Sequence, residues 1–276
     1  MKIFKKASEL EPNLVSIKDK GQSIGLVLTM GNLHDGHLSL IREAQLHNEF
    51  VICSIFINPT QFNNENDFNS YPKTIDEDIS KLENIGCNAL FLPDIQDIYP
   101  KGLAKKKIVN NFRNILCDKF RPGHFDGVTT VVDLFFNMIK PTNSYFGEKD
   151  FQQVKIIQDL VKINHHNIKI IQCPSVRDKM GMSLSSRNSK FSNDQLKIFN
   201  VLGNKIKEHI NRLTQNEINN LDQLKIELLQ NNINKIDYLE IRNENNLEIT
   251  KNYSEARLFI ALYIGDIRII DNFKLY

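Results

Sequence analysis

The sequence has few cysteines, no excess of charge of either sign and no long apolar run. Its four cysteines include no pair with CxxC spacing, which argues against a zinc or dithiol redox motif and fits free thiols in a reducing compartment. Lysine and arginine total 35 against 33 aspartate and glutamate, a balance that gives no reason to expect a nucleic-acid partner. The longest apolar runs, such as residues 24–30, have strand length, whereas a membrane span needs about 20 residues.

The N-terminal segment also lacks the apolar core of a secretory signal, so we expect a cytoplasmic protein with no membrane partner. What is present is an ordinary globular composition of 276 residues, 41% hydrophobic and 25% charged, which suits one large or two medium domains. We interpret the lysines at 105–107 and the pair His165 and His166 as solvated loops. The asparagine-rich stretch 216–252 is interpreted as tolerated surface.

The hydrophobic pattern alternates between strands and helices through the first part of the chain. Strand-like runs at 24–30, 51–58 and 89–92 are separated by amphipathic helix patterns, the second of which opens with a capping box at Thr74. Such a series predicts a parallel sheet with helices on both faces. Further along, strands are expected at 145–147 and 168–172, each associated with a helix pattern.

After about residue 175 the alternation weakens. A helix capped by Ser192 and Gln195 is expected to run to about residue 211, a second helix covers 221–230, and three strand-like runs follow. We therefore expect two domains, a nucleotide-binding α/β domain at residues 1–175 and a smaller α+β domain at residues 176–276.

The strongest local motif lies between the first of these strands and its helix. It consists of Met30, Gly31, Asn32, Leu33, His34, Asp35, Gly36 and His37. Ligands of open parallel sheets bind where strands end, and a helix N-terminus favours phosphate. The two imidazoles can lie on one side of the first turn and donate to the same phosphate. The alternative is two ordinary histidines, one capping the helix and one solvated.

Four further polar clusters could contact ligands. One follows a strand and contains Gly147, Glu148, Lys149, Asp150 and Gln153. Its lysine could reach nucleotide phosphates, and its aspartate could accept from ribose hydroxyls or bind metal-held water. The alternative is an acidic first helical turn at the surface, which is common. The polar loop at 183–188 could grip phosphates or simply form a turn, and amides near Gln61 could orient a small polar substrate. The cluster at 121–127 has a salt-bridged loop as its structural alternative.

Taken in order from residue 24 to residue 272, these motifs resemble the pantoate–β-alanine ligase (pantothenate synthetase) family. The HDGH segment is similar to the HxGH signature of the wider nucleotidyltransferase superfamily. Its combination with INPTQF, RPGHFDGVTTVV, FGEKDFQQ and LSSRN is specific to the ligases, and the final IRIIDN resembles their C-terminal strand.

The resemblance implies a Rossmann-like, doubly wound parallel sheet that binds nucleotide and pantoate, followed by a smaller C-terminal α+β lid domain. It also implies a two-step ligation in which pantoate attacks Mg-ATP to give pantoyl adenylate and pyrophosphate. The β-alanine amine then displaces AMP to form pantothenate. ATP as substrate, Mg²⁺ as cofactor, pantoate and β-alanine as small-molecule partners, and a homodimer belong to the same expectation.

Individual roles follow from the resemblance as well. His34, His37, Lys149 and Arg187 would be catalytic, with His37 the proton donor, while Gln61 and Gln153 would hold pantoate and Gln61 also β-alanine. The ATP-binding set would be the residues 30–37 named above, those at 147–150, and Val176, Leu184, Ser185, Ser186 and Arg187. Asn32 and the run 182–184 depart from the family pattern. By the same resemblance the run Asp76, Glu77 and Asp78 would lie near the metal, but Glu77 stands where aspartate is common, so metal ligands stay unassigned.

Two other functions stay open from the residues alone. An adenylyltransferase of the same superfamily would share the HDGH segment and the fold, but would not need paired glutamines in a small-acid pocket. A nucleotide-binding regulator without activity would be expected to lose His37 or Lys149, and this chain keeps both.

Overall fold

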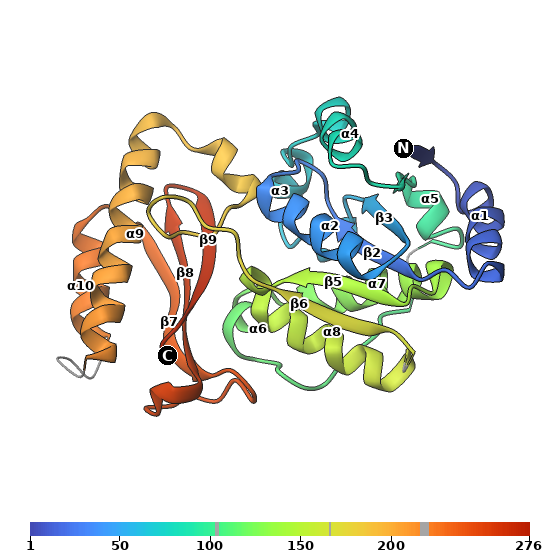
Figure 1. Cartoon of the computed structure of the whole chain (residues 1–276). Coiled ribbons are helices and arrows are strands. Elements are labelled where there is room, and N and C mark those ends of the chain that lie inside the picture. Colours follow the sequence, from blue (N-terminus) through green and yellow to red (C-terminus); the bar gives the residue numbers. More distant parts are fainter. Residues whose placement is uncertain (103–104, 166, 216–220) are drawn as a thin grey trace. The chain divides into compact units, whose positions relative to one another are not determined.

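The computed structural model describes residues 1–102, 105–165, 167–215 and 221–276, and the chain divides into two compact units (Figure 1). The first unit comprises Met1–Arg113 and Arg121–Pro174, and the second comprises Asn114–Phe120 and Ser175–Tyr276. The second unit therefore includes a short segment from the middle of the chain. Within the described residues, none of the helices combines the length and the apolar composition that crossing a bilayer requires.

The first unit is built on a six-stranded parallel sheet in the order β1-β4-β3-β2-β5-β6. Its strands are β1 (Lys2–Phe4), β2 (Ile24–Thr29), β3 (Phe50–Ile55), β4 (Ala89–Phe91), β5 (Asn143–Gly147) and β6 (Lys169–Cys173). The chain proceeds from β2 to β3 on one side, whereas β5 lies on the other side of β2. The point at which the strand order reverses therefore falls between β2 and β5.

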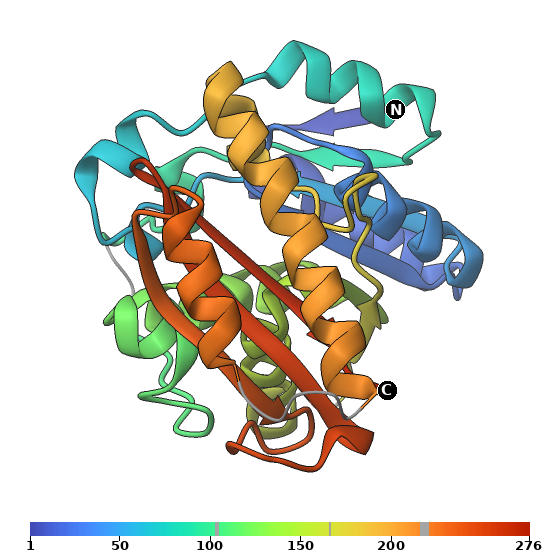
Figure 2. The same cartoon turned by 90° about the vertical axis from the view of Figure 1, so that its left-hand side faces the viewer.

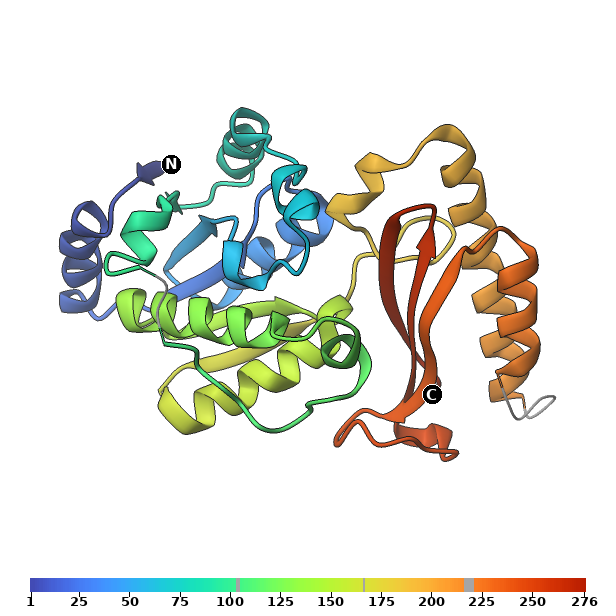
Figure 3. The same ribbon diagram turned by 180° about the vertical axis from the view of Figure 1, so that it is seen from behind.

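Helices cover both faces of this sheet, as predicted. On one face, α2 (Asp35–His47) and α4 (Ile75–Asn84) bury a cluster that includes Ile41 and Leu82 with Val51 and Leu90 of the strands. On the opposite face, Phe135 of α7 (His124–Ile139) packs against Phe91 of β4. Figure 3 shows α7 beside α8 (Phe151–Asn164) on that face. The other helical elements of this unit are α1 (Ala7–Asp19), η1 (Pro59–Gln61), α3 (Glu65–Asn69), α5 (Ile95–Ile98) and η2 (Glu148–Asp150).

The second unit is an antiparallel three-stranded sheet with helices packed on it. The strands β7 (Lys235–Asn243), β8 (Ala256–Ile264) and β9 (Ile267–Lys274) are neighbours in that order. Apolar side chains of β8 are buried against α9 (Asn193–Thr214) and α10 (Asp222–Gln230), which lie side by side in Figure 2. The short helix α6 (Leu116–Phe120) contacts β8, and η3 (Ser186–Lys190) and η4 (Tyr253–Glu255) complete the unit. The predicted Ser192 cap is confirmed, because its Oγ accepts from Gln195 N at 3.3 Å.

Two surface assignments are wrong. His165 is not solvated, because its side chain is only 8% exposed and its Nε2 lies 2.8 Å from Asp133 Oδ1. Its neighbour His166 lies outside the described residues. The asparagine-rich stretch is not surface throughout, since Leu224 and Leu228 are fully buried, and its residues 216–220 are outside the described part. A polar composition concealed the apolar positions that α10 contributes to the core.

Candidate active site

The candidate residues of the first unit follow three neighbouring strands. Since β3, β2 and β5 are adjacent and parallel, their carboxyl ends meet at one edge of the sheet. Residues 30–37 follow β2, the turn with Gln61 follows β3, and residues 147–150 with Gln153 follow β5. The sequence motifs are thus gathered beside the reversal point, where ligands of such sheets bind.

His34 and His37 stack on each other at the N-terminus of α2, with ring centroids 4.1 Å apart. His34 is the N-cap residue, and its Nδ1 accepts from Gly36 N at 3.1 Å. The Nδ1 atom of His37 accepts from His34 N at 3.3 Å. Because each neutral ring accepts at Nδ1, its proton sits on Nε2. The backbone therefore fixes both tautomers, and each ring presents an N–H donor at Nε2.

Both imidazoles are neutral at physiological pH. Burial, followed by the Lys149 ammonium, lowers the pKa of His34 to about 4. Burial, followed by His34 and Lys149, holds the pKa of His37 well below its usual range. The pair supplies uncharged donors, while positive charge comes from Lys149 and from Lys81, whose ammonium also acts on both rings.

A carboxylate from α4 fixes the backbone of the loop before these histidines. Asp78 is fully buried, and its Oδ2 accepts from Asn32 N at 2.9 Å while its Oδ1 accepts from Leu33 N at 2.7 Å. The capping box predicted at Thr74 is wrong, because this hydroxyl lies 3.3 Å from Asp78 Oδ2 and makes no cap bond. Asn32 has a left-handed φ of 50°, which asparagine tolerates better than most residues. This departure from the family pattern therefore suits its backbone.

Lys81 is the second α4 residue at the loop, and its Nζ donates to Leu33 O at 2.8 Å. The sequence motifs do not include Lys81, and they include Asp78 only in the acidic run 76–78, without predicting its contact with this loop. One signal was available, because Asp78 shares the helix face of Ile75 and Leu82, and a carboxylate on an apolar face requires a partner.

Gln61 lies at the end of η1, and both its side chain and its backbone are held. Its Oε1 accepts from Asn58 Nδ2 at 3.1 Å, and its Nε2 lies 3.2 Å from Met30 Sδ. Its carbonyl oxygen accepts from His124 Nδ1 at 2.7 Å and from Arg121 Nη2 at 3.3 Å. The amide is thus oriented before any ligand arrives.

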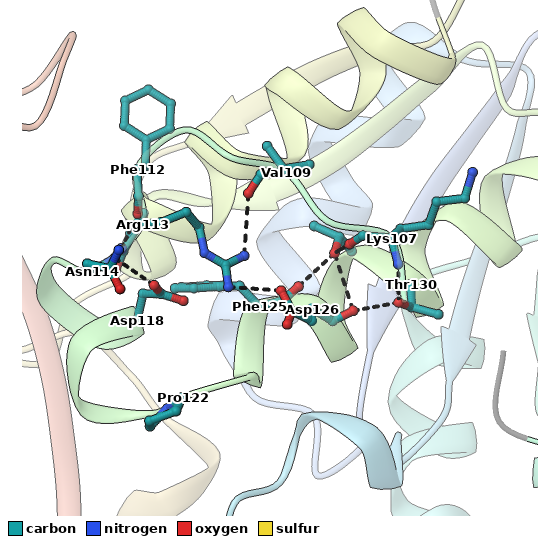
Figure 4. A network of polar contacts seen from close by, with 12 residues as sticks. Lys107, Val109, Phe112, Arg113, Asn114, Asp118, Pro122, Phe125, Asp126 and Thr130 are labelled. Carbon is teal, nitrogen blue, oxygen red and sulfur yellow. Dashed lines mark hydrogen bonds and ion pairs between the residues drawn. The ribbon is translucent and has the colours of Figure 1, made fainter. Parts of the chain in front are cut away.

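The RPGHFDG motif, residues 121–127, contacts the turn that carries Gln61. Its aspartate is salt-bridged, as the structural alternative for this motif predicts (Figure 4). The Arg113 guanidinium lies 2.8 Å from Asp126 Oδ1 at the start of α7. A Cβ at Gly127 would lie 2.4 Å from Thr60 O, so only glycine permits α7 to approach η1 this closely.

The segment after β5 places Lys149 at the same edge. Gly147 ends the strand, Glu148 opens η2, and the Lys149 Nζ lies 3.6 Å from Asp150 Oδ2. The Lys149 side chain is 21% exposed, so its charge is only partly hydrated. This ammonium is close enough to influence both histidines.

Two adjacent glutamines at the start of α8 have different positions. Gln152 is buried, and its Nε2 donates to Phe112 O at 2.8 Å. Gln153 is half-buried on the first turn of the helix. The Gln152 side chain therefore bonds to the backbone of another segment, whereas Gln153 is the candidate for ligand binding.

Carboxylates at this edge do not form a metal cage. Among the residues that the structure describes, no three or more His, Cys, Asp or Glu side chains are grouped to hold a metal ion. Asp78 uses both oxygens on backbone N–H groups, and Asp150 lies beside Lys149.

The remaining predicted residues belong to the second unit. Leu184 N donates to Val176 O at 3.0 Å, so these two residues are neighbours across a hairpin. Ser185 caps η3 by accepting from Arg187 N at 3.2 Å, and Ser186 is the first residue of η3.

Known proteins share both the sequence and this architecture. The family model described as Pantoate-beta-alanine ligase matches residues 2–274. The pantothenate synthetase of Francisella tularensis subsp. novicida (strain U112) is 44% identical over 255 residues, which cover 92% of this chain and 90% of the relative. That of Thermodesulfovibrio yellowstonii is 41% identical over 263 residues, with 93% of each chain covered.

Solved structures agree with these relatives. A pantoate-β-alanine ligase from Francisella tularensis, complexed with β-γ ATP and β-alanine, is 39% identical with a TM-score of 0.86, over 100% of this chain and 98% of that one. The pantothenate synthetase of Thermus thermophilus also has a TM-score of 0.86, at 30% identity and with both chains fully covered.

Proposed function

Because the chain belongs to the pantoate–β-alanine ligase family, we propose that the residues at this sheet edge perform its reaction in the roles given below. The enzyme is a ligase that joins pantoate to β-alanine with ATP. One observation carries the assignment of roles. His34 and His37 are stacked, neutral and fixed as Nε2–H donors at a helix N-terminus beside Lys149.

The first proposed step joins a pantoate carboxylate oxygen to the α-phosphorus of ATP and breaks the bond to pyrophosphate. Carboxylate and triphosphate repel each other, so positive charge must offset this before in-line attack. Lys149 supplies that charge, and His34 and His37 donate hydrogen bonds to phosphate oxygens. Because its pKa is held low, His37 is neutral before ATP binds and can only donate a hydrogen bond. The negative charge of the bound triphosphate raises the pKa of a nearby imidazole, so His37 can donate a proton only after ATP has bound.

Pantoate is proposed to lie between Gln61 and Gln153. The support for this role is that Asn58, His124 and Arg121 fix the Gln61 amide and carbonyl. Neutral amides can orient hydroxyl and carboxylate groups without adding charge to a site that already holds a triphosphate.

In the second step the β-alanine amine attacks the activated carbonyl carbon, and the bond to AMP breaks as the amide forms. A mixed anhydride divides one difficult acyl transfer into two easier steps. Gln61 is proposed to lie near the incoming amine. The Francisella ligase structure, complexed with β-γ ATP and β-alanine, supports a site of this kind in the family.

Nucleotide contacts are proposed for the other residues. Residues 147–150 would contact ribose and phosphate, Val176 the adenine region, and residues 184–187 the triphosphate. Mg²⁺ would enter as Mg-ATP, with phosphate oxygens and water as most of its ligands, because this ion binds few protein groups in nucleotide sites.

A homodimer and a cytoplasmic location are further proposals. All four cysteines are buried and none of them forms a disulfide, which suits a reducing compartment. The dimer rests on the family resemblance, and light scattering of the purified chain in solution tests it.

Product analysis tests the proposed function. AMP and pantothenate should form only when ATP, pantoate and β-alanine are all present. A product that retains AMP would instead indicate an adenylyltransferase, and ATP binding without turnover would indicate a regulator.

A further inference from the structure

A short hairpin in the second unit leads into the residues proposed to bind the triphosphate. Arg177 and Ser183 form an antiparallel bridge, and Leu184 follows directly. Asp178 closes the turn, because its Oδ1 accepts from Met180 N and from Met182 N, each at 2.9 Å. The hairpin therefore has a defined backbone of its own.

One buried carboxylate on β9 holds both strands of this hairpin. The Asp271 side chain is 0% exposed. Its Oδ2 accepts from Ser183 N at 2.7 Å and its Oδ1 from Ser183 Oγ at 2.6 Å. Arg177 Nη1 donates to Asp271 Oδ2 at 3.1 Å and also to Gly181 O at 2.7 Å. Arg177 Nη2 donates to Asn272 O at 2.6 Å.

Packing on α9 fixes the turn of the same hairpin. Met182 is 1% exposed and belongs to the core of the second unit. A Cβ at Gly203 would lie 2.6 Å from Met180 O, so the helix approaches the turn as closely as a glycine allows. The hairpin is thus attached at its turn by packing and at its base by Asp271.

Although Asp271 lies on a strand of the sheet, most of its hydrogen-bond donors come from the hairpin. Its donors are the Arg177 guanidinium, the Ser183 N–H, the Ser183 hydroxyl and the N–H of the adjacent Asn272. A buried charge is retained only where its partners compensate its desolvation. Three of these four donors lie on the segment immediately before Leu184.

We infer that Asp271 is a positioning residue for ATP binding. It acts through Ser183 and Arg177 to set the course of residues 184–187, which would otherwise have to order when the triphosphate arrives. The inference rests on the proposed function, which places these residues on ATP. It gives the C-terminal IRIIDN motif a role in substrate binding in addition to its place in a strand.

The test compares three variants of the full-length enzyme. Asp271→Asn removes the charge and leaves one side-chain acceptor, and Ser183→Ala removes only the hydroxyl contact. Arg242→Gln is the control, because Arg242 is also buried in this sheet and is ion-paired with Glu240 at 2.6 Å. For each variant we would measure KM for ATP, KM for pantoate, kcat and the melting temperature, and we would titrate ATP alone by calorimetry.

Asp271→Asn should raise KM and Kd for ATP by about tenfold, which corresponds to about 1.4 kcal/mol, and leave KM for pantoate within about twofold. Ser183→Ala should act in the same direction by about threefold, and the double variant should be no worse than Asp271→Asn alone. Arg242→Gln should lower the melting temperature without changing ATP affinity.

An unchanged ATP affinity in Asp271→Asn, or an equal loss in Arg242→Gln, would overturn the inference. If Asp271→Asn does not fold, Ser183→Ala decides in the same way. Failure of the proposed function would be distinguishable, because the wild type would then form no pantothenate while the ATP titrations still report on Asp271.

Discussion

Two segments in different units each depend on a buried aspartate: the loop after β2 that is proposed to bind phosphate (residues 30–34, the phosphate loop), and the hairpin before η3 (residues 177–183). Asp78 takes the N–H groups of Asn32 and Leu33, and Asp271 takes the N–H and hydroxyl of Ser183. The groups that compensate the two buried carboxylate charges differ. Asp271 is ion-paired with Arg177, whereas Asp78 is held by backbone N–H groups and lies near the hydroxyl of Thr74.

This difference predicts how each segment should respond when its aspartate is replaced. The phosphate loop carries His34 and His37, whose proposed role depends on neutral and aligned rings, so loss of its anchor should affect turnover. The hairpin leads into residues 184–187, which are proposed to bind the triphosphate, so loss of its anchor should act mainly on ATP affinity. The following changes test this division, beginning with the largest expected effect.

Removing the donors of the phosphate loop should have the largest effect. His34→Ala and His37→Ala should each lower kcat by at least ~10²-fold, the scale for loss of one donor to developing charge. Steady-state kinetics measure this, with His47→Ala as the control on the exposed end of the same helix. Near-normal turnover in either variant would refute the role of that ring.

Removing the anchor of the loop should have the next largest effect. Asp78→Asn leaves a backbone N–H without an acceptor, a loss of about 1–3 kcal/mol, so kcat/KM should fall by roughly 10-fold or more and the melting temperature should drop. Asp76→Asn, at an exposed position of α4, serves as the matched control. If only ATP affinity falls, the distinction from Asp271 is wrong.

The pantoate end of the site should respond separately from both anchors. Gln61→Ala and Gln153→Ala should each weaken pantoate binding by about 1–3 kcal/mol and ATP binding far less, because only one ligand loses its partner. Titration of each ligand measures this, with Gln158→Ala further along α8 as the control. Equal losses for both ligands would make these amides structural.

The smallest effect concerns acid stability. An unfolded histidine titrates near about 6.5, whereas the folded pKa of His34 is about 4. As pH falls through this window the unfolded chain binds more protons, so stability is complete above about 6.5 and decreases toward about 4. Thermal melts against pH should show a shallower decrease in His34→Gln than in the wild type. Parallel curves would show that burial does not shift the His34 pKa.

Much of the fold could be predicted, because β2, β3 and the helices that follow them have clear apolar periodicity. The strand β1 was missed because it has three residues and only Phe4 is buried, so no pattern forms. The motifs located the candidate ligand-binding residues, but Asp78 and Asp271 contact residues that are far away in sequence. Local spacing carries no record of such contacts, and the asparagine-rich composition hid the buried face of α10.

The most direct test of the account is isotope exchange. If pantoate is adenylated first, the enzyme with Mg²⁺, ATP and pantoate should exchange labelled pyrophosphate into ATP in the absence of β-alanine. Arg187→Ala should weaken this exchange strongly. Arg187→Lys should restore it only in part, since an ammonium group cannot make the bidentate contact with phosphate oxygens that a guanidinium can make. Exchange that appears only after β-alanine is added would contradict the proposed adenylate and the roles built on it.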